Sequence, residues 1–362
     1  MMNLTRREFG MLAGAAAVSG LLPEARAENR RLGWCIVALG RISMDHFMPG
    51  LTKSQTGRIV ALVSGHRAKA ERQAAMYGVP TSAIYDYQNY DRVRDNKDID
   101  AVYIALPNSM HAEYTIRGAK AGKHVLCEKP MATSVADSRA MIAACRAAGK
   151  KLMIAYRCQY EPVNLKAIEL IRSGAIGSVQ AIESANGFNI RPGEWRLDRK
   201  MAGGGPLMDV GIYSLNACRY LTGENPGDIH ANSSVIDHDG RFKEVEENVG
   251  WTMKFPSGVV ASCNTSYGAD MNGYYRVHGS KGMVELLPAF GYEGIHMRAR
   301  VAGGKTIDMP DPQSGPEQFT VEADTFANCV WKNQEPKSDG QEGLRDMEFM
   351  SEIYKSAGLP GL

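Results

Sequence analysis

The sequence lacks the features that mark several classes of protein. Its 42 Lys and Arg residues are balanced by 40 Asp and Glu residues, and no run of basic residues occurs in its 362 positions. Without such a run there is no electrostatic footprint for nucleic acid or for an anionic membrane, so we expect neither as a partner. With 44% hydrophobic and 23% charged residues, the fibrous and disordered classes are excluded. The composition is that of a globular chain of about two domains, and we expect its partner to be a small molecule.

The seven cysteines form neither a metal motif nor a disulfide framework. The chain contains no C-x-x-C pair and no set of four Cys and His residues at the spacing of a zinc site. We therefore predict no metal site, and we expect most of these thiols to be buried and to pack as small hydrophobic groups. The cysteines are Cys35, Cys127, Cys145, Cys158, Cys218, Cys263 and Cys329.

Residues 1–27 have the pattern of an export signal. Thr5-Arg6-Arg7-Glu8-Phe9 precedes an apolar run from Met11 to Leu22, and the small-x-small triplet Ala25-Arg26-Ala27 follows. About twelve apolar residues span only ~18 Å of helix, against ~30 Å of hydrocarbon in a bilayer, which favours a cleaved signal over a membrane anchor. The pattern resembles a twin-arginine signal, and such signals export proteins that have already folded. We predict a periplasmic protein that carries a cofactor loaded in the cytoplasm.

Residues 28–155 alternate between short apolar runs and helical patterns. Near-continuous apolar runs of this length are typical of parallel strands that helices cover on both faces. We therefore predict an α/β domain with a doubly wound parallel sheet of the Rossmann type, whose ligands bind at the carboxyl ends of the strands. The expected strands are residues 34–39, 58–63, 101–106, 124–127 and 152–156, and the expected helices are residues 43–51, 66–77 (closed by Gly78), 111–121 and one that starts after Thr133-Ser134-x-x-Asp137.

The first expected strand leads into a turn that resembles a dinucleotide fingerprint. The pattern G-x-G-x-x-G/A falls on Ala38-Leu39-Gly40-Arg41-Ile42-Ser43, so only its second glycine is kept. That glycine lets the backbone approach a pyrophosphate, and the small residues at the flanking positions leave room for it. Such turns also occur without a ligand, but this one lies in the first strand-helix unit. We predict that Gly40, Arg41 and Ile42 bind the phosphates of a dinucleotide.

The second expected strand ends without the carboxylate that is typical of NAD sites. In those sites an Asp or Glu accepts hydrogen bonds from the ribose 2′-hydroxyl. Here the strand runs into Val63-Ser64-Gly65-His66-Arg67-Ala68-Lys69, which offers one hydroxyl and two cations to a 2′-phosphate. We predict an NADP site that includes Ser64, Arg67 and Lys69; the alternative is a solvated loop.

Residues 156–362 have the pattern of a second domain, of the α+β class. A helix expected over residues 161–173 is followed by short alternating segments with turn sequences such as Gly279-Ser280-Lys281-Gly282 between them. Their length and spacing predict a mostly antiparallel sheet. The expected strands are residues 179–184, 249–255, 259–266, 274–278 and 282–287.

Cys127-Glu128-Lys129-Pro130, at the end of the fourth expected strand, carries a motif of a known family. This motif and several others in the same order resemble the glucose-fructose oxidoreductase and inositol dehydrogenase family, above all its periplasmic branch. The resemblance runs through the whole chain after the signal. The other matching segments are Ser64 to Lys69, Ile84-Tyr85-Asp86-Tyr87, Leu106-Pro107-Asn108-Ser109-x-His111-Ala112-Glu113, Tyr156-Arg157-Cys158, Trp195-Arg196-Leu197 and Ala202-Gly203-Gly204-Gly205-Pro206-Leu207-Met208-Asp209-Val210-Gly211-Ile212-Tyr213.

The resemblance implies roles for individual residues. Lys129 matches the family's catalytic-site lysine, next to the nicotinamide and the sugar hydroxyl. Asp209 and Tyr213 match its Asp-x-x-x-His/Tyr pair, in which Tyr213 transfers the proton. The remaining matches are with the cofactor: Leu106, Asn108, His111 and Glu128 around the nicotinamide ribose, Tyr87 near the pyrophosphate, and Arg157, Trp195 and Arg196 beside cofactor and substrate.

The chemistry of the three catalytic candidates agrees with these roles. Oxidation of a sugar hydroxyl removes a proton while a hydride leaves the same carbon, so the site needs a base and a positive charge near the developing alkoxide. Tyrosine has an ordinary pKa of ~10, and we expect the ammonium of Lys129 to lower the pKa of Tyr213. Asp209 and Tyr213 lie four residues apart, on one face of a helix expected over residues 208–220. Taken singly, such residues are commonly surface, capping or core residues, and it is the family register that favours a catalytic role.

The resemblance also implies that the second sheet is open on one face and pairs there with another subunit. An open apolar face is a liability unless it is covered, so we expect a homodimer or a higher homo-oligomer. Only residues 28–32 lie between the predicted cleavage site and the first strand. That leaves no room for the long N-terminal arm with which the periplasmic branch wraps a neighbouring subunit and its cofactor, and both a tetramer and the tightness of cofactor binding stay open.

These predictions converge on a periplasmic sugar oxidoreductase with tightly bound NADP(H). Free nicotinamide cofactors are held in the cytoplasm, so an exported enzyme must recycle its NADP in place. We expect an aldose to be oxidised to its lactone and a second sugar, ketose or aldose, to be reduced to an alditol in a ping-pong cycle. The alternatives are a glycoside hydrolase of the same fold that uses bound NAD(P), a dehydrogenase that uses soluble NADP, and a sugar-binding module without catalysis; Ser64 argues against the first of these.

Overall fold

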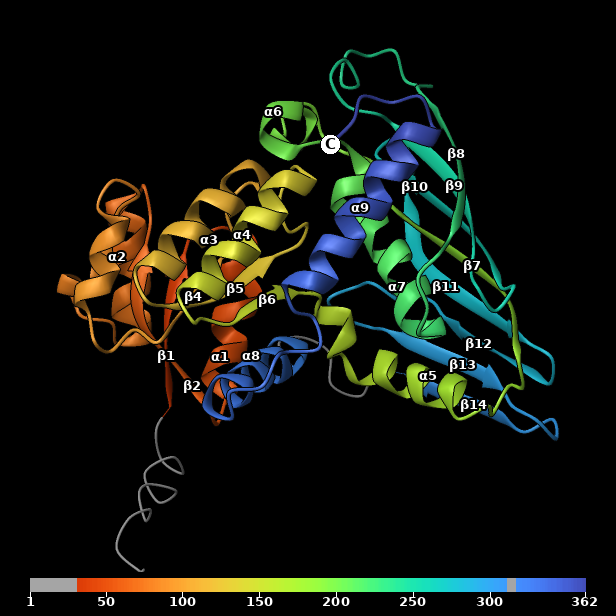
Figure 1. The fold of residues 1–362 in the computed structure, drawn as a ribbon, viewed down its shortest axis with the longest axis horizontal. Helices are drawn as coiled ribbons and strands as arrows, with labels where there is room; N and C mark the ends of the chain where they lie inside the picture. The colour runs from red at the N-terminus through yellow and green to blue at the C-terminus, as the bar shows by residue number, and fades with distance from the viewer. Residues whose placement is uncertain (1–30, 311–316) are drawn as a thin grey trace, which may run out of the picture. The chain divides into compact units, whose positions relative to one another are not determined.

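Two β-sheets organise the chain (Figure 1). The computed structural model describes residues 31–310 and 317–362. The first part of the chain forms a six-stranded sheet and the second part an eight-stranded sheet. Within the described ranges no helix has the length and apolar character that a membrane crossing needs. The export signal over residues 1–27 lies outside the described residues and stays a prediction.

The six-stranded sheet is parallel throughout and has the strand order β3-β2-β1-β4-β5-β6. Its strands are β1 (Leu32–Val37), β2 (Gly57–Val63), β3 (Ile84–Tyr85), β4 (Ala101–Ile104), β5 (His124–Glu128) and β6 (Leu152–Ala155). Every residue of β1, β4 and β6 is buried, as the continuous apolar runs indicate. The predicted doubly wound sheet is therefore confirmed, and its order reverses between β1 and β4, where such sheets bind ligands.

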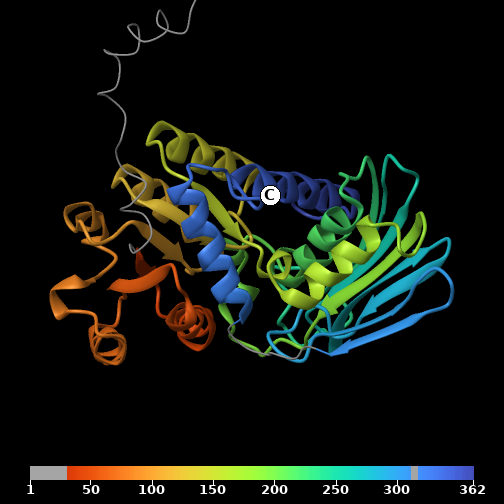
Figure 2. The same cartoon turned by 90° about the horizontal axis from the view of Figure 1, so that it is seen from below.

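Helices cover both faces of this sheet (Figure 2). α1 packs with α8 (Glu317–Trp331) on one face, whereas α3 and α4 pack together on the other. Two sequence signals are confirmed: the Ser134 hydroxyl accepts a hydrogen bond from the backbone N–H of Asp137, and Gly78 ends α2 at φ +68°. The helices of this part, with short 3₁₀ and π segments labelled η, are η2 (Ile42–Phe47), α1 (Met48–Lys53), α2 (Arg67–Tyr77), η3 (Thr81–Ala83), η4 (Tyr90–Asp95), η5 (Asn108–Met110), α3 (His111–Lys120) and α4 (Val135–Ala147).

The eight-stranded sheet has the order β14-β13-β12-β11-β7-β10-β9-β8. Every pairing is antiparallel except that of β7 with β10, so the mostly antiparallel sheet is confirmed. Three strands were not predicted, β8, β13 and β14; β8 and β14 are the edges and bury few residues, which leaves little pattern to detect. The strands are β7 (Val179–Gly187), β8 (Asp228–Ser234), β9 (Asn248–Lys254), β10 (Val260–Ser266), β11 (Met271–Gly279), β12 (Gly282–Leu286), β13 (His296–Arg300) and β14 (Thr306–Pro310).

Helices pack on one face of this second sheet only, as far as the described residues go (Figure 1). These helices are α5 (Pro162–Arg172), α7 (Ile212–Thr222) and α9 (Gly340–Ser356). The segment η6 (Arg157–Gln159) precedes α5 in the chain, and η7 (Trp195–Leu197), α6 (Arg199–Ala202) and η8 (Leu207–Gly211) lie between α5 and α7. The other face carries exposed polar residues such as His230, Thr252, Asn264 and Arg298. The open face is thus polar at these positions, so the argument that an open apolar face must be covered does not apply to it. The expected homo-oligomer stays a prediction that rests on the family resemblance.

The cysteines are placed as the sequence predicts. Six of the seven are buried, Cys329 is half-buried, and all seven are free thiols. The sulfur atoms of Cys218 on α7 and Cys263 on β10 lie 3.7 Å apart. They fill the layer between that helix and the second sheet, as small hydrophobic groups do.

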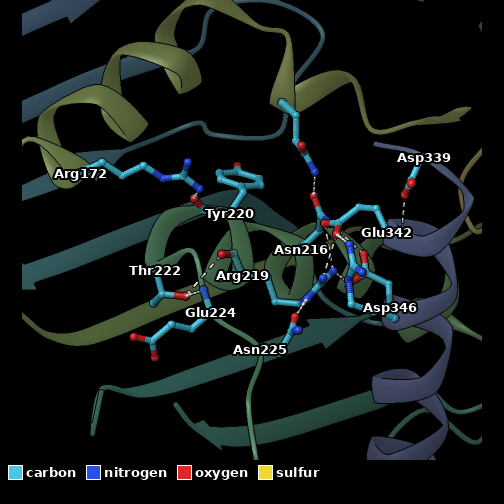
Figure 3. Close-up of polar contacts among 12 residues, drawn as sticks. Arg172, Asn216, Arg219, Tyr220, Thr222, Glu224, Asn225, Asp339, Glu342 and Asp346 are labelled. Carbon is cyan, nitrogen blue, oxygen red and sulfur yellow. Dashed lines mark hydrogen bonds and ion pairs between the residues drawn. The ribbon is translucent and has the colours of Figure 1, made fainter. Parts of the chain in front are cut away.

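A buried ion cluster joins α7 to α9 (Figure 3). Arg219 of α7 donates hydrogen bonds of 3.0 and 2.9 Å to the two carboxylate oxygens of Glu342, and another to Asp346. Asn216, about one turn earlier, donates to both carboxylates. The Arg219 side chain is only 5% exposed and that of Asp346 is fully buried. The cluster thus ties the C-terminal helix to the helix that carries Tyr213.

We expect Arg219→Met to destabilise the protein by roughly 3–5 kcal/mol, because it leaves the buried Asp346 carboxylate without its cation and removes the buried partner of Glu342. The matched control is Arg345→Met, which removes the 40% exposed side chain that also contacts Glu342 and should change the free energy of unfolding by less than about 1 kcal/mol. Urea unfolding at neutral pH measures the free energy of unfolding of both variants. Equal midpoints for the two variants would show that the cluster does not hold α9 in place.

Candidate active site

The candidate residues gather where the carboxyl ends of β1, β4 and β5 meet at one edge of the parallel sheet. Gly40 follows β1, Asn108 follows β4, and Lys129 follows β5. The second part of the chain reaches this edge, because the side-chain amide of Asn108 donates to the carbonyl oxygen of Ala202 at 2.8 Å. The site therefore lies where the parallel sheet meets the residues that precede α7.

The turn after β1 is open and shaped to receive phosphates. Ala38, which stands where the fingerprint has its first glycine, has φ +80°, in the left-handed region that glycine normally supplies. A Cβ added to Gly40 would meet no heavy atom within 4 Å, so protein does not fill the space beside the turn. The Arg41 side chain is 81% exposed at the same place. The residues present therefore fit a dinucleotide whose pyrophosphate lies against this turn, at the start of η2 where Ile42 stands.

The loop after β2 is arranged only partly as the NADP prediction requires. Lys69 reaches back to the turn, where its Nζ donates to the carbonyl oxygen of Leu39 at 3.3 Å. The Ser64 hydroxyl closes the loop by accepting a hydrogen bond of 3.1 Å from the backbone N–H of His66. Arg67 instead pairs with Glu71 on its own helix, at 2.8 Å. The structure thus brings Ser64 and Lys69 to the turn and directs Arg67 elsewhere.

Tyr87 lines this same loop. A Cβ on Gly65 would lie 3.2 Å from the Tyr87 ring, which shows how closely the ring approaches the loop backbone. The ring also packs edge-on against Tyr114, with 5.8 Å between centroids. Burial raises the pKa of Tyr87, so it is present as a phenol that can donate a hydrogen bond.

His111 is a structural link between two loops of the site. Its ring is buried, with Nδ1 2.8 Å from the carbonyl oxygen of Pro130 and Nε2 2.8 Å from that of Leu106. Burial lowers the pKa of His111. Both ring nitrogens face backbone, so His111 offers no free nitrogen to a ribose, in contrast to the expectation. It instead ties the segment after β4 to the loop that follows Lys129.

Glu128 lies buried beneath Lys129. One carboxylate oxygen accepts a hydrogen bond of 2.6 Å from the hydroxyl of Tyr103, and the other accepts one of 3.3 Å from the backbone N–H of Lys129. Burial raises the pKa of Glu128 although both its partners and the Lys129 charge act in the opposite direction. The carboxyl group fixes the backbone that presents Lys129 to the site.

Lys129 and Asp209 join the two parts of the chain. Nζ of Lys129 donates to the backbone oxygen of Asp209 at 2.7 Å and lies 3.4 Å from its Oδ1. The second carboxylate oxygen accepts hydrogen bonds from Arg196 Nε at 2.8 Å and from the Tyr267 hydroxyl at 2.9 Å. Burial by itself raises the pKa of Asp209, but Arg196 and Lys129 outweigh it and hold this pKa below the ordinary value. Asp209 is therefore a charged carboxylate between two cations.

Tyr213 lies against the same lysine, but its hydroxyl faces another cation. Nζ of Lys129 is 4.8 Å from the centroid of the ring, whereas the hydroxyl oxygen accepts a hydrogen bond of 3.2 Å from Nε of Arg157. Burial raises the pKa of Tyr213 and outweighs the opposing effect of Arg157. The expectation that Lys129 lowers this pKa is wrong, because the ammonium lies over the ring and gives its hydrogen bonds to Asp209.

Arg157 is fixed behind Tyr213 by backbone oxygens. Its two terminal nitrogens donate to the carbonyl oxygens of Phe290, at 2.5 Å, and Gly291, at 2.9 Å, and to the side-chain oxygen of Gln318, at 2.8 Å. Because Arg157 donates to the phenol oxygen, the hydroxyl hydrogen of Tyr213 remains free to donate to a substrate.

Trp195 and Arg196 lie together on η7. The guanidinium carbon of Arg196 is 4.7 Å from the centroid of the Trp195 ring, while its Nε binds Asp209. The Trp195 side chain is half-exposed, as expected of an aromatic wall beside a polar pocket. Of the two, Arg196 belongs to the charged cluster and Trp195 to its rim.

Four residues of the site escaped the sequence analysis: Tyr267, Tyr292, Gln318 and Glu322. Tyr267 directly follows β10, and its position at a strand end is the one local signal that points to it. Tyr292 lies between His46, with ring centroids 4.1 Å apart, and the guanidinium of Arg157, 4.4 Å from its ring. Gln318 and Glu322 come from α8, and nothing in their neighbourhood along the chain indicates a site.

Glu322 is a buried carboxyl group behind the site. It is fully buried, and within the described part of the chain neither of its side-chain oxygens has a hydrogen-bond partner. Burial and the neighbouring Glu128 raise its pKa well above the ordinary value of 4.5, against the effect of Arg157. Glu322 is therefore present as the neutral acid.

We expect Glu322→Gln to stabilise the protein at pH 8 and to have little effect near pH 4.5. The folded chain keeps a proton on Glu322 that the unfolded chain loses above its ordinary pKa, so wild-type stability falls as pH rises, by about 1.4 kcal/mol for each pH unit until the folded pKa is reached. Glutamine is neutral throughout and avoids this loss. Thermal unfolding from pH 4.5 to 8 measures the difference in stability between the variant and wild type. The control is Glu169→Gln, at an exposed position. A variant less stable than wild type at pH 8 would mean that Glu322 is ionised and paired.

Comparison with known proteins agrees with this geometry. Residues 32–156 match the model of an oxidoreductase family with an NAD-binding Rossmann fold, GFO/IDH/MocA, and residues 164–285 match the model of the GFO/IDH/MocA C-terminal domain. The chain is also similar to a crystal structure of aldose-aldose oxidoreductase from Caulobacter crescentus complexed with glycerol. That likeness has a TM-score of 0.87 and 45% identity, and it covers 91% of this chain and 98% of the other.

Two sequence relatives extend over nearly the same length. D-xylose 1-dehydrogenase [NADP(+)] of Haloarcula marismortui is 30% identical over 341 residues, which cover 92% of this chain and 93% of that protein. 1,5-anhydro-D-fructose reductase of Ensifer adhaerens is 30% identical over 330 residues, which cover 90% of this chain and 96% of that protein. The parallel sheet has an open phosphate turn, the second sheet follows it in the chain as the two family models do, and the relatives match along nearly the whole length. The chain therefore belongs to the GFO/IDH/MocA family of oxidoreductases.

Proposed function

We propose that this chain is a periplasmic sugar oxidoreductase that keeps NADP(H) bound and uses it in two half-reactions. In the first an aldose is oxidised to its lactone, and in the second another sugar, ketose or aldose, is reduced to an alditol. The observation that carries the proposal is the convergence of Lys129, Asp209 and Tyr213, with Nζ of Lys129 2.7 Å from the Asp209 backbone oxygen and 4.8 Å from the Tyr213 ring centroid. The relatives that act on aldoses and on anhydrofructose support a sugar as substrate.

Tyr213 is the proton-transferring residue of this proposal. Its free hydroxyl hydrogen protonates the oxygen of the sugar carbonyl that is being reduced, and its phenolate takes the proton back when a sugar hydroxyl is oxidised. Arg157 stabilises that phenolate through the hydrogen bond from Nε to the phenol oxygen. The same residues serve both directions, as microscopic reversibility requires.

Lys129 supplies positive charge to the sugar oxygen. The Lys129 side chain is only 12% exposed, so water screens its charge weakly and the charge stabilises a developing alkoxide effectively. Asp209 holds the lysine side chain in place through its backbone oxygen and its Oδ1. A dinucleotide held at the Gly40 turn would supply hydride transfer between the two sugars, with its nicotinamide ring beside Lys129.

NADP is the favoured dinucleotide because of the loop after β2. Ser64 and Lys69 lie at the phosphate turn, and no carboxylate at the end of that strand repels a 2′-phosphate. The Haloarcula marismortui relative is an NADP(+) enzyme by name, which supports the choice. A protein exported in folded form would have to retain this NADP.

We further propose that this chain acts as a homodimer or a higher homo-oligomer through the open face of the second sheet.

We expect purified protein to carry bound NADP(H) and to convert a pair of sugars, without added cofactor, into one lactone and one alditol in equal amounts. Absorbance of the dialysed protein near 340 nm after addition of an aldose reports the first half-reaction, and chromatography of the products reports the cycle. Turnover that requires soluble NADP would instead identify a freely exchanging dehydrogenase. Release of nitrophenol from an aryl glycoside would identify a hydrolase.

We expect Tyr213→Phe and Lys129→Met each to lower the rate of both half-reactions by about 10²- to 10⁴-fold, the range of a lost proton-transfer group or charge at the reacting oxygen. Tyr220→Phe is the matched control, since Tyr220 lies on the same helix and its hydroxyl binds Asn164 instead of facing the site. Single-turnover absorbance at 340 nm measures both half-reactions.

The pH profile of the wild-type enzyme separates the role of Tyr213 from a purely structural one. Because burial raises the pKa of Tyr213, the phenolate fraction at neutral pH is small and grows about tenfold with each pH unit. Between about pH 7 and about pH 9 the oxidation rate should therefore rise with pH, while the reduction rate stays level. An oxidation rate that is independent of pH in this range would assign the proton transfer to another group.

A further inference from the structure

Residues 193–203 cross from the second part of the chain to the dinucleotide turn, and we call them the strap. At one end of the strap, Oε1 of Glu194 lies 3.8 Å from Nη2 of Arg41 in the turn after β1. At the other end, the carbonyl oxygen of Ala202 accepts the 2.8 Å hydrogen bond from Asn108 after β4. The strap therefore touches both sides of the point where the order of the parallel sheet reverses.

A dinucleotide bound at this point would lie next to the strap. Its phosphates would lie at the Gly40 turn and its nicotinamide beside Lys129, between the two contacts of the strap. Between these contacts the strap carries Trp195 and Arg196, and Arg196 binds Asp209 at 2.8 Å. The strap is thus placed to cover such a ligand, and it contacts the cluster of Lys129 and Asp209.

Both ends of the strap are rooted in the second part of the chain. Before it, the backbone N–H of Ile190 donates to the carbonyl oxygen of Tyr267 at 2.9 Å. After it, the backbone N–H of Gly205 donates to the buried Glu246 carboxylate at 3.0 Å. Movement of the strap is therefore confined to the residues between these two anchors.

Glycines stand at the two limits of the strap, and both adopt left-handed backbone. Gly193 has φ +82° and Gly203 has φ +84°. A Cβ at Gly193 would meet nothing within 4 Å, whereas one at Gly203 would lie 2.8 Å from Cγ2 of Thr133. The backbone at Gly193 thus has open space beside it, while Gly203 lies against the loop that follows Lys129.

The last residues of the chain hold the strap from outside. Nη2 of Arg199, on α6 within the strap, donates to the carbonyl oxygens of Pro360 at 2.9 Å and Gly361 at 3.1 Å. Figure 1 shows α6 beside the C-terminus. The guanidinium of Arg199 also lies over the ring of Tyr354 on α9, 5.9 Å from its centroid. Arg199 therefore fastens the strap to the C-terminal helix and tail.

We propose that the strap retains the dinucleotide and that Arg199, through the C-terminal carbonyl groups, sets how slowly the dinucleotide leaves. The proposal rests on the proposed function, since it takes NADP(H) as the ligand. Release requires the Arg41–Glu194 and Asn108–Ala202 contacts to open, and the hold of Arg199 on the tail opposes that opening. Arg199 and Glu194 are positioning residues that touch neither the substrate nor the reacting atoms.

The test is the rate at which NADPH leaves the full-length protein. Protein loaded with NADPH is mixed with an excess of NADP+, and the loss of the fluorescence of bound NADPH is followed without any sugar. Arg199→Met should speed release by about fivefold, because it removes two charge-assisted hydrogen bonds in a half-exposed place, and Arg199→Lys should fall between it and wild type. Glu194→Gln should speed release by about twofold. Lys200→Met, a change of the neighbouring exposed cation on α6, should leave the rate as in wild type.

The outcomes separate this proposal from the proposed function. Equal release rates in wild type, Arg199→Met and Glu194→Gln overturn the strap and leave the sugar cycle untouched. Fast release from wild type, together with still faster release from Arg199→Met, supports the strap and overturns the retained cofactor. If Arg199→Met fails to fold, Glu194→Gln decides, because Glu194 has its ion pair at the surface and its loss leaves no buried group unpaired.

Discussion

One buried carboxylate organises the site. Asp209 accepts hydrogen bonds from Lys129, Arg196 and Tyr267, which come from three separate segments of the chain. Without its negative charge, the two cations would face each other in a space that water screens poorly. Lys129 directly follows β5 of the parallel sheet, and Asp209 lies in the segment before α7. The contact between these two charged residues therefore also holds the two parts of the molecule together. The strap joins this arrangement through Arg196, so the cover of the dinucleotide and the catalytic charge share one anchor.

The competition between burial and charge decides the protonation of the site. At Asp209 two cations outweigh burial and the group is ionised, whereas at Tyr213 a single hydrogen bond from Arg157 does not outweigh it and the phenol is kept. Glu322 has the least support from neighbours, and it is held neutral. Asp209 and Tyr213 are therefore divided by their environment into a charged carboxylate and a neutral phenol, although the two residues are only four positions apart.

The C-terminal part of the chain completes the site from behind. α8 packs against α1 and supplies Gln318 to Arg157, while α9 is bound to α7 by the Arg219 cluster. The final residues then reach the strap through Arg199. Residues that follow the second sheet in the chain thus help to fix Arg157, which faces the Tyr213 hydroxyl, and the strap. Contacts of this kind link the two sheets, and residues 31–362 accordingly form one compact unit.

The sequence by itself determined the elements with strong local signals and the identity of the chemical groups. The apolar runs of the parallel strands, the caps at Ser134 and Gly78, and the motifs around Lys129 and Tyr213 are short-range patterns, and the structure places them as these patterns predict. Only the tertiary structure decided the direction in which side chains turn and the protonation they adopt: Arg67 turned to Glu71, His111 became a link between loops, and the pKa of Tyr213 rose. The physical reason is that hydrogen-bond partners and desolvation come from residues distant in the chain, such as Arg157, Gln318 and Glu322, whose proximity no local pattern encodes.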